Sequence, residues 1–159
     1  MDKLTRKAKK VVEKLSLKNK VIATAESCTG GMLGRYLTAI PGSSKVYGYG
    51  FITYSNDAKK KLLGVKEETL SSFGAVSKET VCEMAEGAFF ESGADIAVSV
   101  SGIAGPKGAT DEKEVGLVYV GVKENGKDAF YVKLNLKGNR EKVRKKTAEE
   151  VFNIILKLL

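Results

Sequence analysis

The sequence contains no histidine among its 159 residues. This absence excludes a Ser-His-Asp triad, a Cys-His pair, a zinc ion held by histidine and a histidine general base. Any acid–base chemistry must therefore use Lys, Asp, Glu, Tyr or Cys. The kinds of active site that this chain can build are limited before any motif is considered.

Cysteine and proline are also scarce, with two residues of each. Cys28 and Cys82 are too few for a zinc site of four thiolates and can form at most one disulfide. So little cysteine favours a reducing compartment. Because the 17 glycines far outnumber the prolines, tight turns must depend mainly on glycine.

Long apolar runs are missing as well. None approaches the length of about 18 residues that indicates a transmembrane helix. The charged residues 1–10 are not followed by the apolar stretch of a signal peptide. We therefore expect a cytoplasmic protein that does not bind membranes. Hydrophobic residues make up 43% and charged residues 29%, which is typical of a globular chain, and residues 1–159 fit one domain.

Positive charge is concentrated at the two ends of the chain, whose formal net charge is +8. Residues 1–20 carry about +6 and residues 137–159 about +4. Both segments have a helical pattern, so solvated helix faces explain the charge. A nucleic-acid site is basic too, but it usually adds aromatic residues or a recognition motif, and neither lies near these segments. We therefore do not expect a nucleic-acid partner.

The apolar pattern predicts alternating helices and strands. Helices are expected over residues 4–15 and 32–40, from Asp57 behind a cap at Ser55 or Asn56, behind a cap at Ser77, and over residues 143–158. Strands are expected over residues 21–25, 46–54, 95–101, 115–123 and 129–136, the last two joined by an Asn125-Gly126 hairpin. This order favours an α/β fold, a three-layer α/β/α sandwich with a mixed β-sheet.

The first candidate site is the loop after the first predicted strand. Such a turn exposes side chains at the carboxyl edge of a sheet and directs free backbone N–H groups there. Ser27 or Cys28 can serve as a nucleophile, and the amides near Thr29, Gly30 and Gly31 can form an oxyanion hole. A glycine-rich turn with Thr29 as a helix cap explains the same residues.

A second candidate is Lys59, in the first turn of the helix expected from Asp57. The positive end of the helix dipole disfavours a charged amine there, and burial acts in the same direction. A neutral Lys59 can then act as a base, and without histidine a Ser–Lys pair is the simplest way to activate a hydroxyl. The alternative is an exposed, charged lysine in the run of residues 59–61. Ser55 is a local rival nucleophile, but a capping role explains it.

Two further segments can bind an anion. Residues 99–108 are rich in glycine at a strand end, which lets backbone approach an anion or a planar ligand. They lack the phosphate-loop spacing G-x-x-x-x-G-K-[ST], and G-x-G-x-x-G occurs nowhere, so a nucleoside triphosphatase is disfavoured. Arg140, just before the last helix, can clamp a phosphate with two nitrogens or remain a solvated arginine.

Four segments together resemble the CinA C-terminal domain, the competence/damage-inducible protein family. They are residues 25–31 (AESCTGG), 54–59 (YSNDAK), 74–77 (GAVS) and 101–106 (SGIAGP). The resemblance runs from about residue 3 to residue 158, and it is to the free-standing form of the domain. Members include nicotinamide-mononucleotide deamidases. The resemblance implies an amidohydrolase that converts nicotinamide mononucleotide and water to nicotinate mononucleotide and ammonia, a step of pyridine nucleotide recycling.

The same resemblance implies roles for individual residues. Ser27 matches the catalytic serine and Lys59 the catalytic lysine. Substrate contacts are expected from Thr29, Gly30, Gly31, Tyr54, Asn56, Ser101, Gly102, Gly105 and Arg140. The resemblance implies no metal and no cofactor, a small nucleotide as substrate, and a homo-oligomer, with a dimer as the first expectation.

The chain departs from the family pattern in residues 107–114. Ala109 stands where the family has a second glycine, and Glu114 stands where it has a proline. These changes touch the expected substrate loop and leave Ser27 and Lys59 in place. They favour one alternative function, a domain that keeps the loops to bind a nucleotide or a partner without turnover.

Overall fold

A computed structural model describes all of residues 1–159. The elements in chain order are α1 (Lys3–Leu17), β1 (Ile22–Glu26), α2 (Met32–Thr38), the 3-10 turn η1 (Ser43–Lys45), β2 (Tyr47–Ile52), α3 (Asn56–Leu63), α4 (Glu67–Phe73), α5 (Lys78–Ser92), β3 (Ile96–Gly102), β4 (Leu117–Glu124), β5 (Phe130–Asn135) and α6 (Arg140–Leu158).

The five strands form one mixed sheet in the order β2-β1-β3-β4-β5. Strand β1 lies parallel to both β2 and β3, whereas β4 is antiparallel to β3 and to β5. Every residue of β1 is buried, as expected for a central strand covered on both faces. The mixed sheet is confirmed, as is the hairpin, whose turn places Gly126 at a positive φ of 76°.

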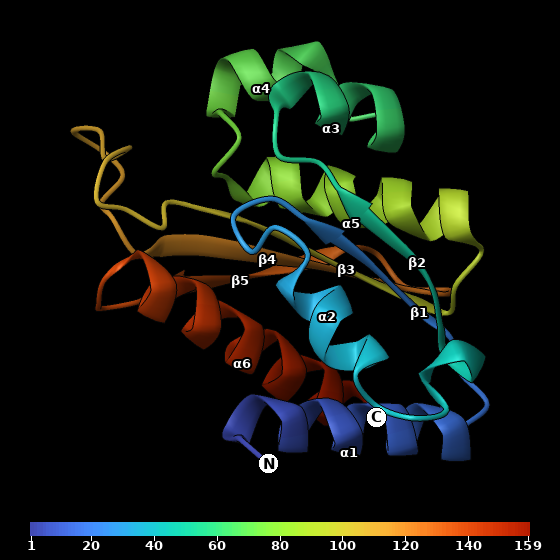
Figure 1. Cartoon of the computed structure of the whole chain (residues 1–159). Helices are drawn as coiled ribbons and strands as arrows, with labels where there is room; N and C mark the ends of the chain where they lie inside the picture. Colours follow the sequence, from blue (N-terminus) through green and yellow to red (C-terminus); the bar gives the residue numbers. More distant parts are fainter.

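Helices cover both faces of this sheet (Figure 1). On one face α1, α2 and α6 pack over a core of 20 buried residues that includes Leu15, Leu33 and Phe152. On the other face α3, α4 and α5 pack over a second core of 10 buried residues that includes Leu63 and Met84. The predicted three-layer α/β/α arrangement is therefore confirmed.

Two details differ from the prediction. Helix α4 was not predicted, because it is short, has no side-chain cap and buries only Thr69 and Leu70. The strand predicted over residues 46–54 is confined to β2. It ends at Ile52 because the chain then bends toward α3, so that the carbonyls of Thr53 and Tyr54 become acceptors for Lys59.

The two basic ends of the chain lie side by side, since α1 packs against α6 (Figure 1). Lys3 and Lys7 of α1 both pair with Glu149 of α6, at 2.6 Å and 3.7 Å. None of the helices combines the length and the apolar character needed to span a bilayer.

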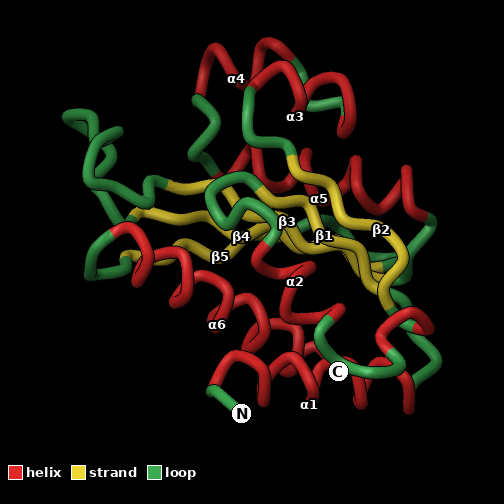
Figure 2. The backbone as a smooth tube through the Cα atoms, viewed as in Figure 1, coloured by secondary structure: helices red, strands yellow, loops and turns green.

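Loops from distant parts of the sequence meet at one edge of the sheet (Figure 2). Because β1, β2 and β3 are parallel, the segments that follow them leave from the same edge. Strand β5 runs the same way as β3, so the start of α6 reaches that edge too. The loop with Ser27 follows β1, residues 103–108 follow β3, and Arg140 follows β5. Lys59 lies in the first turn of α3, which follows β2.

Candidate active site

A cavity of about 260 Å³ lies where these loops meet. The loop after β1 contributes Ser27 and Cys28, and the stretch after β2 contributes Tyr54 and Lys59. The remaining lining residues are Ala75 and Val76, then Ser101, Gly102, Ile103, Ala104, Gly105, Lys107 and Gly108 of the segment at and after the end of β3, and Arg140. Besides Lys59, the lining contains the cations Lys107 and Arg140 and no Asp or Glu, so the cavity suits an anionic ligand.

Ser27 and Lys59 meet at the base of the cavity, although 31 residues separate them in the sequence. The Nζ of Lys59 lies 3.1 Å from the Oγ of Ser27. The same nitrogen donates to the carbonyl of Thr53 at 2.8 Å and lies 3.3 Å from that of Tyr54. A neutral amine has two N–H donors and one lone pair. The two carbonyls take the donors, which leaves the lone pair facing the Ser27 hydroxyl.

Burial of Lys59 disfavours the charged form of its amine. Its side chain is only 1% exposed and makes no ion pair with a carboxylate. Removal from water disfavours the charged ammonium and lowers the pKa of Lys59 below its ordinary value. The exposed lysine that the sequence left open is therefore wrong for Lys59, which is buried. Its neighbours Lys60 and Lys61 do face solvent, where each pairs with a carboxylate.

A buried carboxylate organises the loop that carries Ser27. Glu26, at the end of β1, is 1% exposed. It accepts hydrogen bonds from the Thr29 hydroxyl at 2.6 Å and from three backbone N–H groups, those of Gly31, Leu33 and Gly34. These groups form the N-terminal turn of α2, where the helix dipole also favours negative charge. Glu26 thus caps the N-terminus of α2, because the N-cap residue Gly31 has no side chain that could do so.

This arrangement corrects the predicted oxyanion hole. The N–H of Gly31 donates to Glu26, and the N–H of Gly30 donates to the carbonyl of Ser27 at 3.0 Å, so neither is free for a ligand. The backbone N–H groups of Cys28 and Thr29 have no acceptor elsewhere in the protein. Cys28 lines the cavity directly after Ser27, so its amide is the better placed donor. Thr29 is not the helix cap, because its hydroxyl donates to Glu26.

The substitution Glu26→Gln tests this carboxylate. The amide side chain replaces one acceptor oxygen by an N–H₂ group that faces backbone N–H donors. We expect the free energy of unfolding to fall by about 1–3 kcal/mol. Urea denaturation measures the change. Glu13→Gln is the matched control, because Glu13 is exposed on α1 and its pairing with Lys9 at 3.8 Å is worth little. Equal losses in the two variants contradict the assignment.

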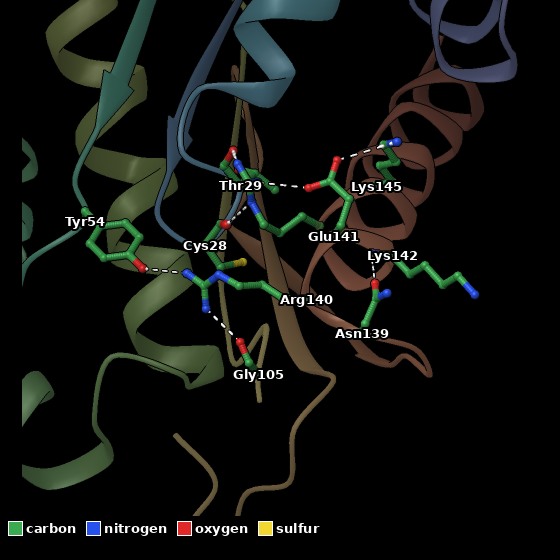
Figure 3. Close-up of polar contacts among 10 residues, drawn as sticks. Cys28, Thr29, Tyr54, Gly105, Asn139, Arg140, Glu141, Lys142 and Lys145 are labelled. Carbon is green, nitrogen blue, oxygen red and sulfur yellow. Dashed lines mark hydrogen bonds and ion pairs between the residues drawn. The ribbon is translucent and has the colours of Figure 1, made fainter. Parts of the chain in front are cut away.

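Arg140 links three parts of the site (Figure 3). It is the first residue of α6, behind the cap Asn139. Its guanidinium donates to the carbonyl of Gly105 at 2.8 Å and to the hydroxyl of Tyr54 at 3.1 Å. The loop after β3 and the stretch after β2 are thereby tied to α6. Arg140 is exposed, as the solvated alternative expects, but its guanidinium is held by these two hydrogen bonds.

The structure brings together seven of the predicted site residues and leaves four outside. Ser27, Lys59, Tyr54, Ser101, Gly102, Gly105 and Arg140 line the cavity. Thr29, Gly30, Gly31 and Asn56 do not. Thr29 is held behind the loop by Glu26, and Asn56 is exposed at the start of α3. Ala109 and Glu114, where the sequence departs from the family pattern, lie outside the lining as well.

The two rival nucleophiles are poorly suited to the chemistry. Burial raises the pKa of the Cys28 thiol to about 11, so it stays protonated and weakly nucleophilic at neutral pH. Ser55 caps α3, where its Oγ accepts from the N–H of Ala58 at 3.0 Å. Cys28 and Cys82 are both free thiols and form no disulfide. Ser27 remains as the hydroxyl next to a base.

The comparison with known families decides where this chain belongs. The model of the CinA C-terminal domain matches residues 4–159. The chain belongs to that family. This CinA C-terminal domain is 50% identical over 149 residues to a CinA-like protein of Kosmotoga olearia, covering 94% of the chain and 36% of that protein. A CinA-like protein of Endomicrobium trichonymphae is also 50% identical, over 150 residues, with 94% and 35% covered. The domain thus spans about a third of the length of these relatives.

Solved structures support the fold of this CinA C-terminal domain. The competence/damage inducible protein CihA of Agrobacterium tumefaciens superimposes with a TM-score of 0.96 at 39% identity, covering 99% of this chain and 96% of that one. A CinA superfamily protein of Enterobacter cloacae gives a TM-score of 0.93 at 32% identity, with 100% and 94% covered. The family and the α/β fold expected from the sequence are therefore confirmed.

Two residues of this site escaped the sequence analysis. The sequence analysis gives Glu26 no role, although a carboxylate between a buried strand and a helix start is a signal for binding backbone N–H groups. Arg144 lies one turn after Arg140 on α6 and donates to the carbonyls of Cys28 and Thr29. Its i,i+4 spacing from Arg140 places both on one face of the helix and is the signal that could have found it.

Proposed function

We propose that this domain is an amidohydrolase that deamidates nicotinamide mononucleotide through an acyl-enzyme on Ser27. The observation that carries the proposal is the 3.1 Å approach of Ser27 Oγ to a buried, carboxylate-free Lys59 in a chain without histidine. A serine beside a lysine with lowered pKa is a known way to activate a hydroxyl. The positive lining of the cavity supports a substrate that carries a phosphate.

The proposed reaction uses these positions as follows. Neutral Lys59 takes the proton of Ser27 while Oγ attacks the carboxamide carbon, and the N–H of Cys28 donates to the resulting oxyanion. Protonated Lys59 then gives its proton to the amide nitrogen, the C–N bond breaks and ammonia leaves. Water attacks the ester, its proton passes through Lys59 back to Ser27, and nicotinate mononucleotide departs. One water is consumed and one ammonia is released.

The remaining lining residues supply binding. Ser101 lines the cavity, so its hydroxyl can bond the carboxamide. A cavity of about 260 Å³ is slightly smaller than most ligand sites, so the amide end fits inside while the phosphate stays at the rim. Lys107 and Arg140 are the cations that can meet the phosphate there. The dimer expected from the sequence remains a further proposal.

Ammonia release from nicotinamide mononucleotide by the purified protein tests the proposal. We expect steady release from the nucleotide and much slower release from free nicotinamide, which lacks the phosphate. Saturable binding of the nucleotide without ammonia release contradicts the proposal and favours a binding domain without turnover, the alternative that the changes at Ala109 and Glu114 raise.

A further inference from the structure

Arg144 holds the backbone of the loop after Ser27, although it does not line the cavity. Its Nε donates to the carbonyl of Cys28 at 3.1 Å, and its Nη2 donates to the carbonyl of Thr29 at 3.0 Å. Its third nitrogen, Nη1, pairs with Glu141 at 3.3 Å. The two carbonyls and Glu141 lie close together beside α6 (Figure 3). The guanidinium thus joins the last helix to two consecutive peptide groups.

Glu26 and Arg144 hold this loop in opposite ways. The carboxylate binds N–H groups that follow Thr29, whereas the guanidinium binds the carbonyls of Cys28 and Thr29. The carbonyl of Ser27 is occupied by the N–H of Gly30. Among the backbone N–H groups of residues 27–31, only those of Cys28 and Thr29 therefore have no acceptor. Thr29 is fully buried and does not line the cavity, so the N–H of Cys28 is the donor left for a ligand.

Arg144 also restrains the donor that lines the cavity. Its hydrogen bond to the carbonyl of Cys28 fixes the backbone on one side of this residue, and the bond from the N–H of Gly30 to the carbonyl of Ser27 fixes the peptide group that carries the Cys28 N–H. Preorganised N–H donors stabilise an oxyanion because they need no reorientation during the reaction.

We propose that Arg144 is a positioning residue that fixes the backbone of Cys28 and Thr29, and with it the oxyanion-binding N–H of Cys28, without touching the substrate. The inference rests on the proposed amidohydrolase function. Arg144 differs in this from Arg140, which lines the cavity itself and bonds Tyr54 and Gly105. A loss of Arg144 lets the peptides after Ser27 rotate, which weakens transition-state binding more than ground-state binding.

The test is steady-state kinetics of ammonia release for Arg144→Ala and Arg144→Lys. We expect kcat of Arg144→Ala to fall about 10- to 100-fold, the usual effect of a misplaced catalytic group, with KM nearly unchanged. Added guanidinium ion restores activity, because the side chain is 28% exposed and the vacated space is reachable. Arg144→Lys recovers only part of the rate, since an ammonium lacks the planar fork that serves two carbonyls. If Arg144→Ala fails to fold, Arg144→Lys still tests the inference.

Lys145→Ala is the matched control. Lys145 lies on the same helix and pairs with the same Glu141 carboxylate, at 3.5 Å, but makes no contact with the loop. It should keep the wild-type kcat. A wild-type kcat in Arg144→Ala overturns the inference. A lower kcat that added guanidinium does not restore, together with a higher KM, also overturns it, because that pattern indicates a general distortion of the site.

A second readout separates this inference from the proposed function. If the wild type releases no ammonia, the proposed substrate is wrong, but acylation of Ser27 by p-nitrophenyl acetate still reports on the oxyanion hole. Slow acylation in Arg144→Ala, with rescue by guanidinium, then supports the inference. Equal acylation rates in the wild type and Arg144→Ala, or no acylation in the wild type, overturn it.

Discussion

Replacing Ser27 by alanine should reduce ammonia release from nicotinamide mononucleotide by about 10⁴-fold or more, the effect of removing a catalytic nucleophile. Ser27 Oγ is the hydroxyl at 3.1 Å from Lys59 Nζ in the cavity, and no other serine bonds that amine. The variant should still fold and bind the nucleotide, because Ser27 makes its backbone bond to Val100 through its own N–H. Initial rates and calorimetric binding of the nucleotide measure the two effects.

Cys28→Ala is the control for this prediction. The thiol lies beside Ser27 and lines the same cavity, but burial raises its pKa to about 11 and it faces no base at hydrogen-bond distance. Removing the thiol leaves the Cys28 N–H in place, so kcat should stay within a few-fold of the wild type. A result in which Cys28→Ala is inactive and Ser27→Ala is active reverses the assignment of the nucleophile.

Replacing Lys59 by methionine should reduce kcat by about 10³-fold, which lies within the usual contribution of a general acid–base group. Methionine fills the space of the buried stem but can neither accept the Ser27 proton nor donate to the leaving ammonia. Lys60→Met is the matched control, because Lys60 lies on the solvent side of α3 and pairs with Glu67 at 2.5 Å. Nearly equal rates for Lys59→Met and the wild type exclude Lys59 as the base.

The pH profile of the wild type is a second test of Lys59 as the base. The base works in its neutral form, so activity is present above the pKa of Lys59 and is lost as the pH falls through it. Because burial lowers that pKa, the rise in kcat should lie below pH 10.4, the ordinary value for lysine. The residual activity of Lys59→Met should lack this rise. A rise at or above the ordinary value contradicts a neutral, buried base.

The fold could be predicted because its signals are local. The apolar stretch of β1, the period of α6 and the Asn125-Gly126 turn each depend on residues close together in the chain. Helix α4 escaped prediction because its short amphipathic face buries only two residues, so the pattern was too weak. The end of β2 was misplaced because its carbonyls turn toward Lys59, a contact that no propensity encodes.

In the candidate site, only residues whose side chains have a recognisable chemical role could be predicted from the sequence. The family motifs and the absence of histidine together indicated Ser27 and Lys59. The amides of Gly30 and Gly31 were wrongly predicted as oxyanion donors, because they donate to Glu26 and to the carbonyl of Ser27, contacts that the sequence does not reveal. Arg144 lies 116 residues from Cys28 in the chain, and only the packing of α6 against the loop brings them together.

The most direct test of this account is to trap the covalent intermediate. The enzyme is mixed with nicotinamide mononucleotide, quenched in acid after a few milliseconds to seconds, digested and examined by mass spectrometry. We predict a nicotinate-mononucleotide ester on Ser27 in the peptide that contains residues 21–35, and none in the Ser27→Ala variant. Ammonia release with no adduct at any quench time, or an adduct on the neighbouring Cys28, contradicts the Ser27–Lys59 mechanism.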